Sequence, residues 1–148
     1  GRAAAYYWRN VFHNPDFVRG QEGDPPNNLL NYGYAIVRAM VARALVAAGL
    51  LPTLGIHHHN RYNAYCLADD IMEPYRPFVD QLVIYMMKRY EDISEFNTEM
   101  KRDLLGLAYQ DVLIDGKRSP MQIAIQTTAN SVYKCFSGEA RKIIYPDW

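Results

Sequence analysis

Residues 27–51, which read NNLLNYGYAIVRAMVARALVAAGLL, form an almost continuous apolar run in this 148-residue chain. The run predicts one long helix that ends before Gly49, because Pro52 follows three residues later. Asn27 or Asn28 is a suitable residue to cap its beginning. Apolar side chains fall on nearly every face of this helix. We therefore expect it to lie at the centre of the core, in contact with the other helices on all sides.

The same run is long enough to raise the question of a membrane span. Asn31, Arg38 and Arg43 interrupt it at positions where polar and charged groups are costly in lipid, so a buried helix is the better interpretation and no membrane partner is expected. Nothing in the sequence resembles a signal peptide. Cys66 and Cys135 lie far apart without metal-type spacing, which predicts core residues of a protein from a reducing compartment.

Length and composition indicate one globular domain over residues 1–148. Hydrophobic residues make up 49% of the chain and charged residues 22%, which excludes a disordered chain. A domain of this size buries roughly two thirds of its unfolded surface around a single core. The 16 basic and 16 acidic residues give a formal net charge of zero. Binding to DNA or RNA would therefore require basic side chains to gather on one face.

Helical periodicity recurs through most of the chain. Asn97 or Thr98 can cap one further helix, and Ser119-Pro120-Met121-Gln122 has the spacing of a capping box with proline at the first helical position of another. Asp115-Gly116 is a turn signal between these two helices. The sequence therefore predicts an all-α fold of several helices. The expected helices cover residues 2–12, 27–48, 64–73, 75–90, 98–112 and 121–136.

The first predicted helix has no residue in front of it that could cap its amino end. The chain opens with Gly1-Arg2 and not with methionine. We interpret the chain as a fragment of a longer polypeptide, and an artificial addition at Gly1-Arg2 is the alternative.

Two segments, HHHNRYN at 57–63 and DDIMEPYRP at 69–77, mix imidazole and carboxylate ligands densely. Asp70 and Glu73 are three positions apart, so on a helix their carboxylates share one face, with Cβ atoms about 5 to 6 Å apart. Two carboxylates at that separation repel each other unless a cation lies between them. Oxygen ligands favour a hard ion such as Mg²⁺ or Mn²⁺, and one imidazole shifts the preference toward Mn²⁺.

Each of these signals has a simpler explanation when it is taken alone. Three consecutive histidines cannot all reach one ion, because neighbouring side chains of an extended chain face opposite ways. A single histidine is most often a surface residue or a hydrogen-bonded core residue. Asp70 and Glu73 could form a solvated helix face or an ion pair with Arg76 or Arg61.

Several segments together resemble a known family. The most specific is LADDIMEPYRP at 67–77, in which an Asp-Ile-Met-Glu-Pro-x-Arg-Pro run follows a Gly-x-x-His motif at 55–58. The sequence is similar to the helical C-terminal domain of the CRISPR adaptation integrase, nearest to its type II forms, through most of its length. The other matching segments are Tyr7-Trp8, Asn31-Tyr32-Gly33-Tyr34 and Gly49-Leu50-Leu51-Pro52.

The resemblance implies a metal-dependent DNA endonuclease or integrase, in which a DNA 3′-hydroxyl attacks a phosphodiester of the CRISPR repeat. In that family a glutamate, a histidine and an acidic residue bind Mg²⁺ or Mn²⁺. The histidine corresponds to His58 and the acidic ligand to Glu73, which makes these two the catalytic residues, and Asp70 is a neighbouring carboxylate that orients the site. The family's glutamate precedes a Gly-x-Ala-Ala helix, so its place falls just before Gly1, outside this sequence.

The resemblance also implies partners for the intact protein. A β-rich N-terminal domain, absent here, would form the homodimer, and a small second adaptation subunit would bridge the dimers in the prokaryotic cytoplasm. The DNA partners would be the spacer precursor and the CRISPR repeat. We expect this fragment alone to bind metal weakly and to be inactive, because the first glutamate and the β-rich domain are missing.

Four residues are candidates for DNA contacts. Arg61 and Arg76 are the basic residues closest in sequence to the expected ligands, and Arg38 stands one helical turn after Tyr34. For the arginines, salt bridges to Asp69, Asp70 or Glu73 are the alternative. Tyr34 could stack on a displaced base, and core packing is its alternative in so apolar a helix.

Two other functions fit the same residues. A truncated helical module could retain DNA or partner binding without catalysis. A metal-dependent phosphohydrolase of small molecules would use the same ligand types, and it predicts a closed pocket without exposed arginines.

Overall fold

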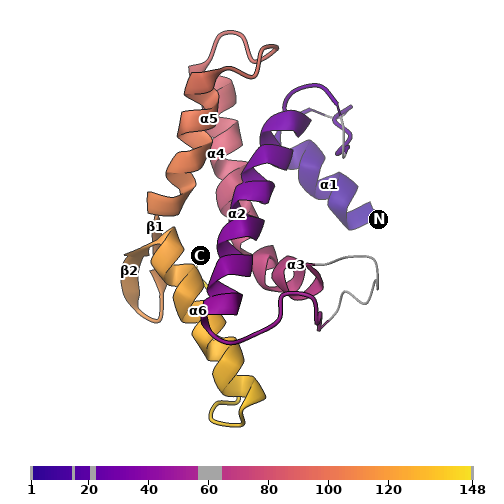
Figure 1. Ribbon diagram of the computed structural model, residues 1–148. Helices are drawn as coiled ribbons and strands as arrows, with labels where there is room; N and C mark the ends of the chain where they lie inside the picture. Colours follow the sequence, from indigo (N-terminus) through magenta and orange to yellow (C-terminus); the bar gives the residue numbers. More distant parts are fainter. Residues whose placement is uncertain (1, 15, 21–22, 57–64, 148) are drawn as a thin grey trace.

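The structure is a computed structural model that describes residues 2–14, 16–20, 23–56 and 65–147. It consists of helices with one small hairpin before the last of them (Figure 1). The helices are α1 (Arg2–Val11), α2 (Asn27–Ala47), α3 (Cys66–Met72), α4 (Arg76–Arg89), α5 (Thr98–Leu105) and α6 (Met121–Phe136). The shorter elements are the 3-10 helices η1 (Glu73–Tyr75) and η2 (Gly106–Tyr109) and the strands β1 (Asp111–Ile114) and β2 (Lys117–Pro120).

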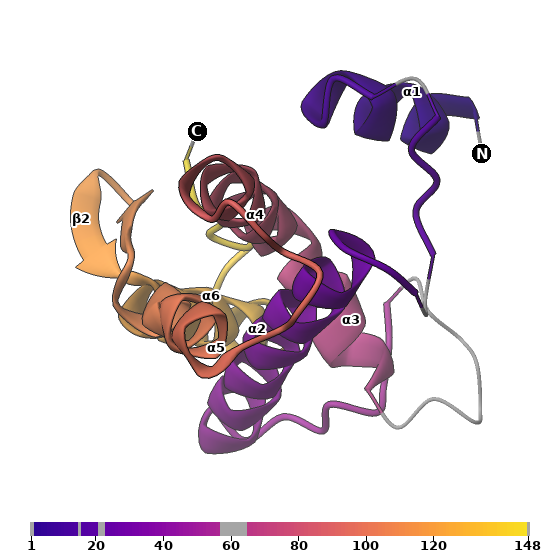
Figure 2. The ribbon, with the colours of Figure 1, turned by 90° about the horizontal axis from the view of Figure 1, so that it is seen from above.

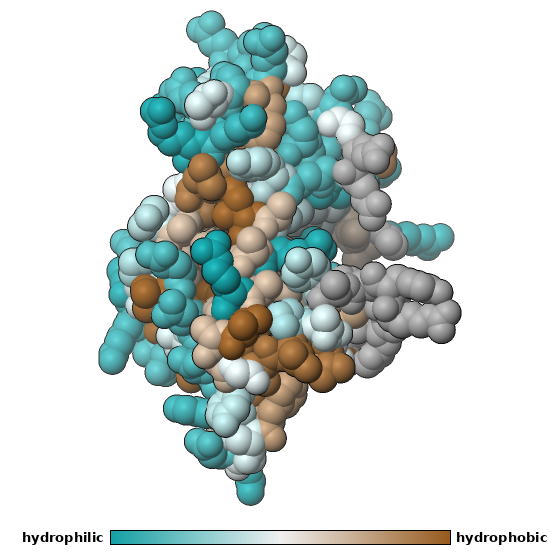
Figure 3. Space-filling model, viewed as in Figure 1, coloured by the Kyte–Doolittle hydropathy of each residue, from teal (hydrophilic) through white to brown (hydrophobic). Residues whose placement is uncertain are grey.

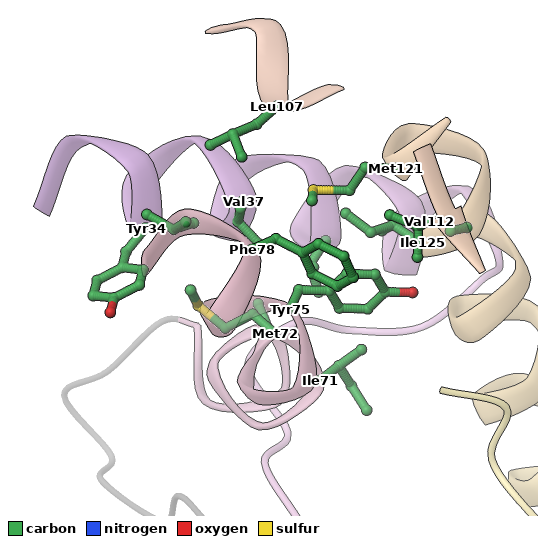
Figure 4. Close-up of a cluster of buried hydrophobic side chains, with 14 of the residues drawn as sticks. Tyr34, Val37, Ile71, Met72, Tyr75, Phe78, Leu107, Val112, Met121 and Ile125 are labelled. Carbon is green, nitrogen blue, oxygen red and sulfur yellow. The ribbon is translucent and has the colours of Figure 1, made fainter. Parts of the chain in front are cut away.

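The predicted central position of α2 is confirmed, but the expected contact on all sides is wrong, because Ala39, Arg43 and Val46 are exposed. This helix contacts α3, α4, α5 and α6, and it crosses the middle of the molecule in Figure 1. Its buried side chains, among them Tyr34 and Val37, share one hydrophobic cluster with side chains from the surrounding elements, such as Phe78 and Leu107 (Figure 4). Among the described residues, α2 is the one helix long and apolar enough to cross a membrane. Here it is a core helix that packs against α3, α4, α5 and α6.

The N-terminal helix α1 lies apart from this bundle. None of its residues is buried, and Figure 2 shows it set off from the other helices. Trp8 and Phe12 stack with their ring centroids 5.9 Å apart, and Phe17 of the next loop contacts both rings. These half-buried aromatic side chains pack against the core. They connect α1 to the loop that leads into α2.

The expectation of a strictly all-α fold is wrong for residues 111–120. The helix predicted to reach residue 112 ends at Leu105, and η2 follows it. The chain then forms an antiparallel hairpin in which Val112 pairs with Ser119. Consequently Ser119 and Pro120 belong to β2. Pro120 also occupies the N-cap position of α6, which begins at Met121 without a hydrogen bond from a capping side chain. The capping-box prediction is therefore also wrong.

The hairpin has clear physical causes. Asp115 and Gly116 have φ angles of 50° and 71°, and positive values at both central residues are those of a two-residue hairpin turn. Val112 and Ile114 are buried, while the residues that alternate with them are exposed. This alternation is that of a half-buried strand. The core contacts of these two side chains override the helical interpretation of the segment.

Other local predictions are confirmed in part. Asn97 caps α5, because its side-chain oxygen accepts a hydrogen bond from the Met100 backbone N–H at 2.9 Å. Cys66 is buried, as predicted for a core residue, whereas Cys135 is only half-buried and does not belong to the core. Figure 3 shows hydrophobic patches across the middle of the face seen in Figure 1, between more polar ends. Exposed apolar side chains such as Leu51 and Leu54 come from the loop after α2.

Candidate functional site

Two of the predicted ligands lie where α3 passes into η1. Asp70 stands in the last turn of α3, and Glu73 is the first residue of η1. Pro74 occupies the first turn of η1, where its missing N–H leaves no helical hydrogen bond unmade. The Asp70 Oδ2 atom accepts a hydrogen bond from the Ile56 backbone N–H at 2.6 Å. This carboxylate therefore ties the loop after α2 to α3.

The Glu73 side chain is half exposed and pairs with Arg76. Its Oε1 atom lies 3.0 Å from the Arg76 Nε, one turn further along the chain. The ion-pair alternative considered for Glu73 is thus present in the structure. An ion pair at this level of exposure is worth about 0 to 1 kcal/mol. The Glu73 carboxylate can therefore exchange the arginine for a cation at little cost.

The described carboxylates suit a hard cation but do not complete a site for one. Asp70 and Glu73 offer oxygen ligands within one helical turn, the type that Mg²⁺ and Mn²⁺ prefer. Among residues 2–14, 16–20, 23–56 and 65–147, no three His, Cys, Asp or Glu side chains come together as a metal site requires. The predicted ligand His58 and the predicted DNA contact Arg61 lie outside the described residues. The metal site stays a prediction.

A cavity of about 530 Å³ with basic walls is lined by Arg76, the ion-pair partner of Glu73. Three arginines line it, and they come from three segments: Arg19 from the loop before α2, Arg38 from α2 and Arg76 from α4. The Arg38 Nε atom lies 2.7 Å from Oδ1 of Asp69, which is buried on α3. Guanidinium groups that converge on one cavity favour an anionic ligand, and phosphate fits their fork of donors.

Tyr34 supports two of these arginines. The Cζ atoms of Arg76 and Arg19 lie 4.9 and 5.4 Å from the centroid of its ring, within the range of a cation–π interaction. The tyrosine is buried, and Figure 4 shows it at the edge of the core cluster with its hydroxyl directed away from the other labelled side chains. This is the core packing considered above as its alternative role. Stacking of Tyr34 on a displaced base stays a prediction.

Asp80 of α4 is the hydrogen-bond partner of that hydroxyl. Its carboxylate is 3% exposed and accepts a bond from the Tyr34 hydroxyl on Oδ1 and one from the Tyr7 hydroxyl on Oδ2, the second at 2.7 Å. Burial raises the pKa of Asp80, and the two hydroxyl bonds and the charges of Arg76 and Arg19 oppose that shift. Burial also raises the pKa of both tyrosines, so they remain protonated donors.

Arg19 is fixed in the cavity wall by two asparagines of α2. Its Nη2 donates to Asn31 Oδ1 at 2.6 Å and its Nη1 to Asn27 Oδ1 at 3.0 Å. The prediction that Asn27 or Asn28 caps α2 is wrong, because the N-cap position is Pro26 and no side chain caps the helix; the Asn27 side chain reaches back to the loop instead. Burial lowers the pKa of the Arg19 guanidinium, which still carries a full charge near neutral pH.

The sequence-based predictions named neither Arg19 nor Asp80. Two weak signals were available. Asn27 and Asn31 are one turn apart on an otherwise apolar helix, which indicates a polar partner for that face. Asp80 follows Phe78 and Val79 within a core-facing stretch, and a carboxylate there requires hydrogen-bond donors.

Comparison with known proteins assigns the family. The family model described as CRISPR associated protein Cas1 matches residues 1–112, which is more than half of the chain. This chain belongs to the Cas1 family. The family resemblance inferred from the sequence is thereby confirmed.

Two relatives show how much of a Cas1 protein this chain represents. The CRISPR-associated endonuclease Cas1 of Neisseria meningitidis serogroup C (strain 8013) is 34% identical over 130 residues, which cover 88% of this chain and 42% of the relative. A CRISPR-associated endonuclease Cas1 of Pyrobaculum aerophilum is 33% identical over 134 residues, with 89% of this chain and 45% of the relative covered. The chain therefore spans less than half the length of these Cas1 relatives.

A solved structure of similar fold is that of a casposase bound to an integration product. It superposes with a TM-score of 0.78, covers 97% of this chain and 47% of the casposase chain, and is 23% identical in sequence. Because the sequence identity is low, this similarity shows only that this Cas1 family member and the casposase share the fold of the helices and hairpin.

Proposed function

We propose that this chain is the helical C-terminal catalytic part of a metal-dependent DNA integrase and endonuclease, close to the type II forms of the Cas1 family. The observation that carries the proposal is the position of Arg76. Its guanidinium pairs with Glu73, an expected metal ligand, and also lines the arginine cavity. A cation-binding carboxylate and a phosphate-binding guanidinium thus stand side by side, as attack on a phosphodiester requires.

The proposed ligands of Mg²⁺ or Mn²⁺ are His58 and Glu73, with Asp70 as a further ligand or as the carboxylate that orients them. The bond from the Ile56 N–H to Asp70 supports the inclusion of His58, which follows Ile56 by two residues in the sequence. The ion would polarise the phosphoryl oxygen and stabilise the charge that develops there. The helical turn between Asp70 and Glu73 sets the spacing of the two carboxylates.

The proposed reaction is a transesterification that needs no external oxidant or energy source. A DNA 3′-oxygen forms a new bond to phosphorus as the bond to the leaving oxygen breaks, and the proton of the attacking hydroxyl is transferred to the leaving side. Phosphate contacts would come from Arg38 and Arg76 and, in addition to the predicted residues, from Arg19. Arg61 would extend this basic surface, and Tyr34 would hold Arg19 and Arg76 in place.

The intact protein would contain more than this chain. We propose the β-rich N-terminal domain, the homodimer and the small bridging subunit as its further parts, with spacer-precursor and repeat DNA as partners in the prokaryotic cytoplasm. The fraction of the Cas1 relatives that the chain covers supports this view. Catalysis is accordingly proposed for the intact protein, and the isolated chain is expected to be inactive.

Metal binding can be tested on the chain as it stands. Titration with Mn²⁺, followed by electron paramagnetic resonance of the free ion, should give weak binding that Glu73→Gln reduces at least tenfold. The matched control is Glu95→Gln, which removes an exposed carboxylate from the loop between α4 and α5. Equal Mn²⁺ affinity in the Glu73 and Glu95 variants would remove Glu73 from the site.

Strand transfer in the longer polypeptide separates the proposed function from its alternatives. With Mn²⁺, His58→Ala and Glu73→Gln should abolish transfer of a labelled DNA end but leave DNA binding in place. A non-catalytic helical module would bind DNA and transfer nothing, even without substitution. A small-molecule phosphohydrolase would hydrolyse p-nitrophenyl phosphate, but the partly exposed side chains of Arg38 and Arg76 disagree with its closed pocket.

A further inference from the structure

The segment before α2 forms one wall of the arginine cavity, yet it is loosely packed. Trp8 of α1 and Arg19 of the following loop both line the cavity. No residue of α1 is buried, and Figure 2 shows the helix set off from the bundle. A helix of ten residues is not stable by itself in water. Its position must therefore depend on a few specific contacts with the bundle.

One such contact is the hydrogen bond from the Tyr7 hydroxyl to Asp80. It joins α1 to α4, and the same carboxylate accepts the hydroxyl of Tyr34 from α2. Three helices thus meet at one buried carboxylate. Each of its two oxygens accepts one hydrogen bond from a tyrosine hydroxyl. Hydrogen bonds to a charged acceptor in a buried setting are among the stronger ones. This arrangement fixes the register of α1 against the bundle.

The charge of Asp80 also balances the two arginines on the Tyr34 ring. Two guanidinium groups near one ring repel each other unless an anion lies close by. Asp80, bonded to the hydroxyl of that ring, supplies the negative charge, and it interacts electrostatically with both Arg19 and Arg76. The described residues that line the cavity do not include Asp80 itself.

We propose that Asp80 is a positioning residue, which acts through Tyr7 and Tyr34 to hold α1 and the arginines Arg19 and Arg76 in place around a bound phosphate. The phosphate is that of the nucleic acid, so this part rests on the proposed function. The anchoring of α1 by Asp80 does not depend on the proposed function. The anchor and the effect on phosphate binding can therefore be tested separately.

Hydrogen exchange measured by mass spectrometry tests the anchor. Tyr7→Phe should increase exchange in peptides from residues 2–11 about tenfold, as expected for loss of a hydrogen bond to a buried charge, and leave peptides from α5 and α6 unchanged. Tyr6→Phe is the matched control, because Tyr6 is the neighbour on α1 and is 74% exposed. Asp80→Asn should act like Tyr7→Phe. If the peptides from residues 2–11 exchange at the same rate in Tyr7→Phe and Tyr6→Phe, the anchor is disproved. This comparison remains decisive even if Asp80→Asn does not fold.

Fluorescence anisotropy with a labelled DNA oligonucleotide tests the consequence for the cavity. Tyr7→Phe should weaken binding three- to tenfold without changing its salt dependence or the melting temperature of the bundle. Arg19→Gln should weaken binding and also lower the salt dependence, because it removes a charge. Faster exchange in α1 with unchanged affinity would overturn the role of Asp80 in the cavity. If the unsubstituted chain binds no DNA, the role of the cavity in holding a nucleic-acid phosphate is disproved, while the exchange result still decides the anchor.

Discussion

Gly33 of α2 lies directly against Val79 of α4, so close that a Cβ atom added to the glycine would stand 2.4 Å from the valine Cγ1. Real Cβ atoms do not approach another carbon so closely. The absence of a side chain at residue 33 therefore sets the separation of the two helices. Because α4 begins at Arg76, the same contact also determines how far the cavity arginines of α2 and α4 stand apart.

We predict that Gly33→Ala destabilises the protein by about 1 to 3 kcal/mol, the usual cost of adding a methyl group to a well-packed core. The obstacle is the short branched side chain of Val79, which cannot swing away as the end of a longer side chain could. Urea denaturation followed by circular dichroism gives the free energy of unfolding. Combining Gly33→Ala with Val79→Ala should be less harmful than the sum of the two single changes. Strict additivity would disprove the contact.

A second prediction concerns Tyr75 and Thr128, whose side-chain oxygens lie 2.7 Å apart in the core. Burial raises the pKa of Tyr75 to about 12, so the hydroxyl is neutral at ordinary pH. Tyr75→Phe should cost about 1 to 2 kcal/mol, because it leaves the threonine hydroxyl buried without this partner. The double variant with Thr128→Val should recover most of the loss, since both polar groups are then removed. If the double variant has an unfolding free energy no higher than that of Tyr75→Phe alone, the hydrogen bond does not explain the loss of stability.

The buried carboxylate of Asp80 predicts a pH dependence of stability. Because burial raises its pKa, the folded protein retains the proton at pH values where the unfolded chain, with a carboxyl pKa of 3.8, has released it. Raising the pH from 3.8 through the folded value therefore favours unfolding. Asp80→Asn cannot titrate, so the stability of the unsubstituted protein relative to this variant should fall over that interval. Urea denaturation at a series of pH values measures the difference, and a constant difference would refute the prediction.

Arg76 should contribute to DNA binding through its charge. Arg76→Gln should weaken binding of a short DNA duplex about three- to tenfold and lower the slope of log K against log salt by about 1, as expected for one lost phosphate contact. Arg102→Gln is the matched control, since Arg102 is exposed on α5 away from the cavity. Anisotropy titrations at several salt concentrations give both quantities. Equal slopes for the two variants would place Arg76 outside the DNA interface.

The sequence predicted those parts of the fold that local signals control. The apolar run of α2 and the cap at Asn97 lie within single elements, and both predictions agree with the structure. The hairpin depends on distant contacts. Val112 and Ile114 pack into a core built from other helices, and Ile114 forms a bridge to Pro146. Periodicity within residues 98–112 carries no information about those partners, so the segment resembled one helix.

Part of the candidate site could likewise be predicted from the sequence, and part could not. The spacing of Asp70 and Glu73 and the resemblance of residues 67–77 to a known family directed the prediction to the junction of α3 and η1, where the metal site stays a prediction. The hydrogen bond from Tyr7 to Asp80 joins residues from different helices. Such pairs follow from how the helices pack and not from intervals along the chain. This is why Arg19 and Asp80 emerged only with the structure.

The small hairpin is arranged so that it does not extend into a larger sheet with other molecules. The free side of β1 is occupied by the chain's own last residues, through the bridge between Ile114 and Pro146 and a bond from the Asp147 N–H to the Leu113 oxygen at 2.8 Å. The strand β2 pairs only with β1 in the part of the chain that the structure describes, and it carries Lys117 at one end and a proline at the other. Charged side chains and proline on an edge discourage edge-to-edge association. A protein with an apolar middle surface is thus protected at its two strand edges against aggregation.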